Sequence, residues 1–451
     1  MEDLLVVNST RLIIAALVGL GLLLFLIIKV KIHPLIAMLL GALAIGLIAG
    51  MPLEMIGSTV TKGVSNTLGN IALLIGLGSM FGAILEISGG AECVAITLLD
   101  RFGEKKSAWA LGLTGMIIAT PVFFEAGLIT LIPLAMSIAK RTGKSTLSYG
   151  IPLLCGLAVG HAFIPPTPGP VLVAGILGVD LGIVIIMGII CGSVALVCAG
   201  LIFGKYAGDK YYIAVPDDIG TQIKIDENKL PAFGTVVGII LIPLLLVVLS
   251  SVSSVVAALE PVRPVFTFLG TPFVAMLIAV LAAMAMLGIH HGYSTAELKK
   301  VLEKSLEPTG MVLLVVAGGG ILRYMLEDSG LGDVIGGFMA SSPLPMIVLV
   351  FLVAVCVRVA IGSTTVSATM AAGIVASTPE IANYSPMYLA ACTLAICSGA
   401  AVLSHVNDSG FWLVKSMFKM DEKTTLKTWT VMETILGMTG FLTALVISFF
   451  C

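Results

Sequence analysis

Long apolar stretches, separated by short polar segments, recur along the 451-residue chain. The clearest of them are Leu12 to Ile28, Leu35 to Ile48, Thr235 to Leu249, Phe273 to Gly288 and Thr434 to Phe450. A helix needs about 20 mostly apolar residues to cross the hydrocarbon core of a bilayer. The pattern therefore predicts a protein that crosses the membrane many times.

Composition points to the same solvent. Hydrophobic residues make up 58% of the chain and charged residues 11%, with a mean hydropathy of +1.12, far from the balance of soluble domains. The N-terminal residues Glu2 and Asp3 are unlike the basic start of a signal peptide, so the first apolar stretch is expected to be retained. The net charge of -2 and the scattered basic residues predict no nucleic-acid partner.

Several motifs occur twice, in the same order, in the two halves of the chain. The segment PLIAML at Pro34 recurs as PFVAML at Pro272, 238 residues later. The Glu-x-Ser-Gly segment at Glu86 recurs 241 residues later, and the polar segment at His161 recurs 244 residues later, at His405. Three ordered matches indicate an internal duplication.

The longest polar stretch, from Lys205 to Pro231, lies between the two halves. We therefore predict a first transmembrane repeat over residues 1–204, a polar cytoplasmic linker over residues 205–233 and a second transmembrane repeat over residues 234–451.

Basic loops orient the chain, because cytoplasmic loops carry an excess of Lys and Arg. The loop with Glu327, Asp328 and Asp333 should then be outside. The 33 apolar residues between Lys106 and Lys140 should form a hairpin entering from the cytoplasm, and Pro343 to Pro379 a hairpin entering from outside. The residues assigned to the cytoplasmic side are Lys29, Lys31, Arg101, Lys105, Lys106, Lys140, Arg141, Lys144, Lys299, Lys300, Lys304, Lys415, Lys419, Lys423 and Lys427.

Opposite hairpins in matched halves are typical of inverted-topology repeats, in which the substrate binds near the midplane at interrupted helices. The predicted fold is an all-α polytopic membrane protein whose repeats each hold about five spans, one re-entrant hairpin and one broken helix. This organisation indicates a secondary transporter.

The tip of the first hairpin, Ala119 to Gly127, includes Thr120 and places the carboxylate of Glu125 among apolar residues. A charged group at membrane depth costs a few kcal/mol, so such residues usually have a function. Glu125 is predicted to bind a proton or orient the substrate, and burial would raise its pKa toward the useful range. The alternative is a structural partner for a buried donor.

The tip of the second hairpin runs from Arg358 to Ser367 and contains Gly362 and neutral hydroxyl groups. The planar guanidinium of Arg358 suits a carboxylate, so an acidic substrate would offset its burial. A permanent salt bridge to Glu125 explains the arginine equally well, since buried charges are normally paired. The hydroxyl groups are those of Ser363, Thr364 and Thr365.

Two further segments interrupt apolar stretches. His161 to Pro170 holds four prolines, which cannot continue a helix, and presents Thr167 and Gly169. Ser404 to Gly410 is a polar island in which His405 and Asp408 could titrate and couple transport to protons. The alternative for this island is a cytoplasmic loop with a helix N-cap, because Asn407, Asp408 and Ser409 suit that role.

Other features predict no cofactor, metal site or disulfide framework. The eight cysteines lack metal-ligand spacing, and Gly318 to Gly320 lacks the context of a nucleotide-binding loop. His33, His290 and His291 lie beside loop residues and are interpreted as surface side chains. A membrane-embedded enzyme using His405 and Asp408 as base and orienter is disfavoured, because the chain lacks an H-E-x-x-H metal motif and a duplication explains the paired histidines better. A passive channel is disfavoured by inverted halves with discontinuous helices.

At these motifs, over essentially its whole length, the chain resembles the gluconate permease family of bacterial organic-acid:proton symporters. The segments that carry the resemblance are GMPLEMIGSTVTKGVSNTLG from Gly50, FFEAGLITLIPLA from Phe123, the Pro165 to Pro170 stretch, RVAIGSTTVSATMAAGI from Arg358 and SHVNDSGFWLVK from Ser404. Thr167 and Ser409 depart from the familiar pattern, and both could alter substrate choice.

The resemblance implies an elevator-type transporter, a homodimer in the bacterial inner membrane, whose partners are a small organic acid, protons and the lipid bilayer. The expected substrate is gluconate or a related sugar acid; D-serine, D-glycerate or a sodium-coupled carboxylate are alternatives. The predicted substrate-binding residues are Thr120, Glu125, His161, Thr167, Gly169, Arg358, Gly362, Ser363, Thr364, Thr365, Ser404, His405, Asn407 and Asp408. The candidates for proton coupling are Glu125, Asp408, His161 and His405.

Overall fold

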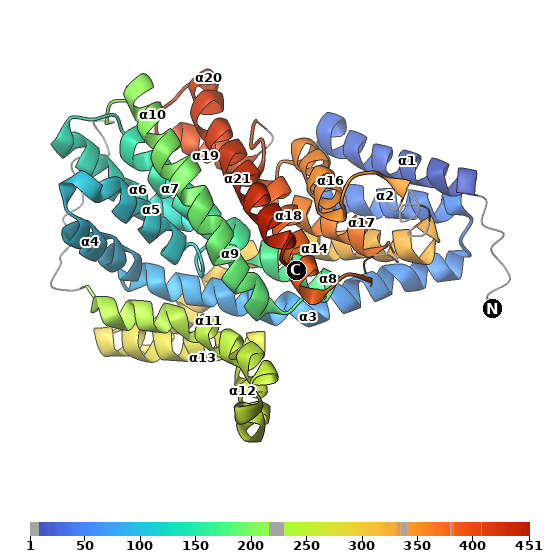
Figure 1. Ribbon diagram of the computed structural model, residues 1–451, viewed down its shortest axis with the longest axis horizontal. Coiled ribbons are helices and arrows are strands. Elements are labelled where there is room, and N and C mark those ends of the chain that lie inside the picture. The colour runs from blue at the N-terminus through green and yellow to red at the C-terminus, as the bar shows by residue number, and fades with distance from the viewer. Residues whose placement is uncertain are drawn as a thin grey trace.

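A computed structural model describes residues 9–215, 230–331, 334, 341–378, 381, 383–406 and 408–451. Throughout the described residues the regular structure is helical (Figure 1). The prediction of an all-α protein is confirmed. Asn407 and Asp333, and residues 216–229 of the predicted linker, lie outside the described residues.

The first half of the chain begins with two apolar helices and one much longer helix. The helices are α1 (Ser9–Phe25), α2 (Pro34–Ala49), α3 (Leu53–Ile87), α4 (Gly90–Phe102), α5 (Ser107–Ile118), α6 (Phe124–Thr142), α7 (Leu147–Phe163), α8 (Pro168–Leu177), α9 (Leu181–Ala195) and α10 (Phe203–Lys210). The π-helical segments η1 (Leu26–Val30) and η3 (Leu196–Ile202) extend α1 and α9, and η2 (Glu104–Lys106) is a short 3-10 turn.

The second half follows a similar order. Its helices are α11 (Phe233–Val255), α12 (Arg263–Leu269), α13 (Pro272–Ala283), α14 (Thr295–Asp328), α16 (Met346–Ile361), α17 (Thr364–Ala376), α18 (Pro386–Ala401), α19 (Ser409–Met417), α20 (Glu422–Thr425) and α21 (Val431–Ser448). Shorter segments are η5 (Ala257–Val262), η6 (Met284–Gly288), η7 (Ile289–His291) and η9 (Leu426–Thr430).

Several of these helices have the length and composition of membrane spans. Among the described residues, six pass that test singly, and the bent halves of α3, which meet at 42°, pass it together. Shorter apolar helices, including α2, α16 and α18, add to the apolar body. The chain is therefore a multi-pass membrane protein, whereas five spans per half stays a prediction.

The helices α3 and α14 form an antiparallel pair along the long axis of the molecule (Figure 1). At one end the Tyr293 hydroxyl donates to the Ile87 carbonyl at 2.6 Å. At the other end the Lys62 ammonium lies 2.8 Å from the Asp328 carboxylate. The contacts join the two helices at both ends of the pair, and α2, α13 and α17 pack against it.

Four interruptions of the helices divide the rest of the chain. The chain reverses between α5 and α6 over Ala119 to Phe123, and between α16 and α17 at Gly362, whose φ of +87° suits glycine. The helices α7 and α8 are separated by Ile164 to Thr167, where consecutive prolines deny the helix its backbone donors. The helices α18 and α19 are separated by residues 402–408.

Small residues let α5 pack closely on α7. A Cβ atom placed on Gly156 of α7 would lie 2.0 Å from the carbonyl oxygen of Gly112 in α5. Glycine is thus the residue that permits this backbone approach, as at many helix contacts in membranes. The contact holds the middle of α5 against the middle of α7.

Candidate functional site

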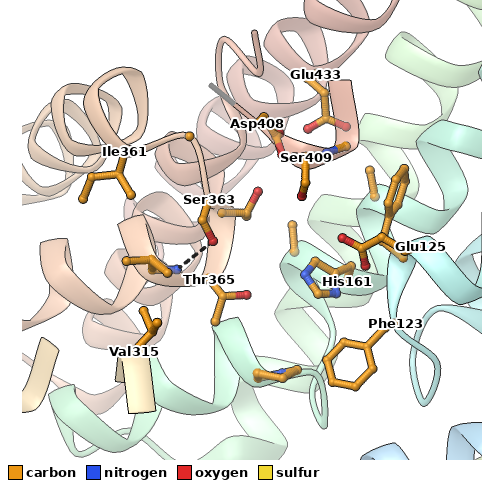
Figure 2. Close-up of a pocket in the computed structure, with 18 of the residues that line it drawn as sticks. Phe123, Glu125, His161, Val315, Ile361, Ser363, Thr365, Asp408, Ser409 and Glu433 are labelled. Carbon is orange, nitrogen blue, oxygen red and sulfur yellow. Dashed lines mark hydrogen bonds between the residues drawn. The ribbon is translucent and has the colours of Figure 1, made fainter. Parts of the chain in front are cut away.

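A cavity of about 470 Å³ lies where the four interruptions meet (Figure 2). Each interruption contributes the first residues of the helix that follows it. These are Phe123 to Glu125 for α6, Pro168 for α8, Ser363 to Val366 for α17 and Asp408 to Gly410 for α19. The remaining wall comes from α14, through Met311, Val315 and Val316, and from α7 and α21.

Four helix N-termini therefore converge on one space. The N-terminus of a helix carries about half a positive elementary charge and backbone N–H groups without helical partners. The Ser363 hydroxyl accepts from the Val366 amide at 3.5 Å, and the Asp408 carboxylate accepts from the Gly410 amide at 2.9 Å. These two caps each occupy one amide, and the N-terminal amides that they leave open suit the binding of an anion.

Arg358 lies behind the wall of the cavity, and its side chain is 1% exposed. Its Nη2 atom lies 2.5 Å from Oδ2 of Asp408, and its Nη1 atom donates to the carbonyl oxygen of Gly362. The salt bridge to Glu125 that the sequence suggested is not the one formed, because the partner is Asp408. The guanidinium thus ties the tip of the second hairpin to the start of α19.

Asp408 combines the two roles between which the sequence left a choice. It caps α19 through Oδ1, as an N-cap residue does. Its Oδ2 atom accepts from Arg358 and, at 2.5 Å, from the Ser404 hydroxyl. Asp408 is therefore a helix cap, one partner of a buried ion pair and part of the cavity wall at once.

Ser404 extends this network to η9 and α6. The Trp429 indole N–H donates to the Ser404 hydroxyl at 2.7 Å, and the Thr430 hydroxyl donates to the Ser404 carbonyl. The Trp429 ring lies against Phe124, with ring centroids 5.4 Å apart. The segment between α18 and α19 is thereby joined to the start of α6 beside the cavity.

Glu125 and His161 face the same space from α6 and α7 (Figure 2). Glu125 is exposed to the cavity, which corrects the expectation that its carboxylate would be buried. His161 is half-buried, and its Nδ1 atom has no hydrogen-bond partner among the described residues. Both side chains are placed to contact a molecule in the cavity.

The other predicted residues lie farther from the centre of the cavity. The Thr120 and Thr167 hydroxyls donate to the carbonyls of Met116 and Ile164, and both residues line a cavity of about 20 Å³ on the other side of His161. Gly169 is buried in the first turn of α8. The His405 ring lies 3.2 Å from the Val359 carbonyl, outside the large cavity. Asn407 lies outside the described residues.

Three residues that the sequence did not single out line the cavity. Glu433 of α21 stands at the edge of an apolar stretch, where a carboxylate is a signal that the sequence offers. Trp429 lies one turn before it, in a segment without any motif. His33, interpreted as a surface residue, lines the cavity, and its Nε2 atom lies 2.9 Å from the Met311 sulfur.

Comparison with known sequences gives one consistent family. The profile of GntP family permeases matches residues 11–450. The chain is 36% identical over 440 residues to the low-affinity gluconate transporter of Escherichia coli K12, covering 97% of this chain and 98% of that protein. It is 37% identical over 445 residues to the gluconate permease of Pseudomonas aeruginosa, covering 98% of each.

Comparison with solved structures shows the fold independently. MtrF of Neisseria gonorrhoeae, described with a class of antimetabolite efflux pumps, superposes with a TM-score of 0.65. The match covers 98% of this chain and 95% of MtrF at 16% identity, so it concerns the fold alone. The family resemblance inferred from the motifs is confirmed: this chain is a member of the GntP permease family, a membrane transport protein and not an enzyme.

Proposed function

We propose that this permease is a secondary active transporter that takes up gluconate or a related sugar acid together with protons. The observation that carries the proposal is the convergence of four helix N-termini on one cavity, which provides positive potential for an organic anion. The names of the gluconate-transporting relatives support the same substrate class.

The wall of the cavity suits a polyhydroxylated acid. Its carboxylate would lie against the N-terminal amides of α17 and α19, which are held in place by Arg358. The hydroxyls of Ser363, Thr364 and Thr365 offer partners for sugar hydroxyls, and Trp429 covers an apolar side. Arg358 then positions the N-termini of α17 and α19, and these N-termini contact the substrate directly. A cavity of about 470 Å³ is within the usual size for small-molecule sites.

The architecture supports alternating access by an elevator motion. In this proposal the hairpins α5–α6 and α16–α17 and the broken helices move together against α1 to α3 and α11 to α14. The antiparallel packing of α3 on α14, whose sequences match 241 residues apart, is what an inverted repeat over residues 1–204 and 234–451 requires. A homodimer in the bacterial inner membrane would provide the fixed support.

A second substrate class remains compatible with the cavity. The exposed carboxylate of Glu125, in the first turn of α6, lies across the cavity from the N-terminus of α17, so it could hold the ammonium group of D-serine while the N-termini of α17 and α19 hold the carboxylate. D-glycerate, or a carboxylate carried with sodium, would use the N-termini alone.

Exchange of labelled gluconate separates these substrates. Proteoliposomes loaded with unlabelled gluconate should accumulate labelled gluconate transiently, and external gluconate should compete at least about tenfold better than D-serine or D-glycerate, because only the sugar acid engages all the hydroxyls. Protein-free liposomes are the control. If D-serine or D-glycerate exchanges and gluconate does not, the proposed substrate is wrong. If none of these acids exchanges, the transport proposal is overturned.

A further inference from the structure

Glu433 is a carboxylate buried at the wall of the cavity, and no ion pair joins it to a cation in the part of the chain that the structure describes. It lies in the first turn of α21 and is 4% exposed. Its Oε1 atom has no hydrogen-bond donor among the described residues. Figure 2 shows the side chain pointing toward the cavity from the same side as Asp408 and Ser409.

The surroundings of Glu433 fix its position. Trp429 and Thr430, in the turn before it, are hydrogen-bonded to Ser404, and the Thr434 hydroxyl after it accepts from the Leu403 amide at 3.3 Å. The start of α21 is thus fastened to the break between α18 and α19. Glu433 has little freedom to leave the wall and reach bulk water.

The charge of Glu433 is not compensated locally. The charged groups whose fields reach it are the Arg358 guanidinium and the Asp408 carboxylate, which already neutralise each other at 2.5 Å. A buried carboxylate without a partner is costly as an anion, whereas its protonated form is neutral and can donate a hydrogen bond. The other titratable groups facing it are Cys155 from α7 and, lining the same cavity, His33, Glu125 and His161.

We propose that Glu433 carries the coupled proton, and that the anionic substrate and this proton bind together in the one cavity. A substrate carboxylate placed beside ionised Glu433 would meet a like charge in a poorly solvated space, whereas protonated Glu433 removes that repulsion. Linkage is reciprocal, so substrate binding favours proton uptake by the same factor. Glu433 takes one proton from the water of the outer side and releases it to the water of the inner side.

The inference rests on the proposed function and sharpens it to one proton for each monovalent anion. It also distinguishes Glu433 from the four candidates chosen from sequence. Asp408 accepts hydrogen bonds from three donors and is paired with Arg358, so its carboxylate is fully engaged. Glu125 is exposed to the cavity, in contrast to the buried Glu433. His405 lies outside the cavity wall. The Glu433→Gln tests described below decide whether Glu433 or His161 carries the proton.

The test measures gluconate binding to the purified permease by calorimetry between pH 6 and pH 9. In the wild type the dissociation constant should rise by about tenfold per pH unit in the alkaline range, as linkage to one proton requires. In Glu433→Gln, whose side chain imitates the neutral acid, this pH dependence should disappear. Glu303→Gln, an exposed acid on α14 paired with Lys299, should behave as the wild type.

A second readout uses vesicles that contain a pH-sensitive dye. An inward gluconate gradient should drive proton influx through the wild type and Glu303→Gln. In Glu433→Gln the number of protons moved per gluconate should be at least about tenfold lower. A Glu433→Gln protein that keeps the wild-type pH dependence or proton flux overturns the proposal and assigns the proton to a histidine of the cavity wall, His33 or His161. A folded Glu433→Gln protein that binds no gluconate at any pH also overturns it, making Glu433 a substrate contact. Wild-type protein that binds no gluconate refutes the proposed function itself.

Discussion

Asp408→Asn should reduce gluconate uptake to background and destabilise the permease by roughly 3–5 kcal/mol. The substitution keeps the shape of the side chain and its capping hydrogen bond, but it leaves the guanidinium of Arg358, 1% exposed, without a counter-charge. It also loosens the tie between Gly362 and the start of α19, two of the helix ends that line the cavity. Thermal unfolding in detergent and uptake in proteoliposomes measure the two effects.

A matched control separates the ion pair from the helix cap. Asp180 caps α9 by accepting from the Ile183 amide at 3.1 Å, and it is exposed. Asp180→Asn should therefore change stability by less than about 0.5 kcal/mol. The double variant Arg358→Met with Asp408→Asn should regain most of the lost stability, because no buried charge is left unpaired. Asp408→Asn protein with wild-type stability would show that the ion pair does not hold the tips together.

A disulfide between α14 and α17 should abolish uptake, because it joins the proposed fixed support to the proposed moving hairpin. A Cβ atom built on Gly319 lies 3.8 Å from the Cβ atom of Thr369, close to the mean separation in disulfides. In Gly319→Cys with Thr369→Cys, a membrane-permeant oxidant should lower the rate of uptake by at least about 20-fold, and a reductant should restore it.

The single variants Gly319→Cys and Thr369→Cys, treated with the same oxidant, control for damage to the eight native cysteines. Complete cross-linking, verified by the loss of free thiols, combined with undiminished uptake would exclude relative motion of these two helices. The elevator proposal would then fail, while the binding site would be unaffected.

The parts of the fold that depend on local sequence could be predicted. Apolar stretches gave helices at the expected places, because hydrophobicity over 15 to 20 residues sets membrane insertion. The break at Pro165 and Pro166 follows from missing backbone donors, and the reversal at Gly362 from the conformational freedom of glycine. These effects act within one turn, so they need no knowledge of the packing.

The side-chain partners in the site could not be predicted in this way. Arg358 and Asp408 are 50 residues apart, and Glu125 was an equally reasonable partner by charge. Only the packing of α16 against the second broken helix decides between them. The sequence does not distinguish Glu433, because it borders the apolar stretch from Thr434 to Phe450. A single carboxylate in that position is also expected at the polar end of an ordinary membrane span. Its burial becomes visible only when α21 is placed beside Ser404.

In the proposed function, proton influx drives this permease to accumulate a sugar acid. The most direct test is uptake of labelled gluconate into proteoliposomes with an imposed inward proton gradient and no sodium. We expect accumulation above the equilibrium level that collapses when a protonophore dissipates the gradient. Gluconate entry that only equilibrates, whatever the gradient, would contradict proton coupling and leave a facilitator in its place.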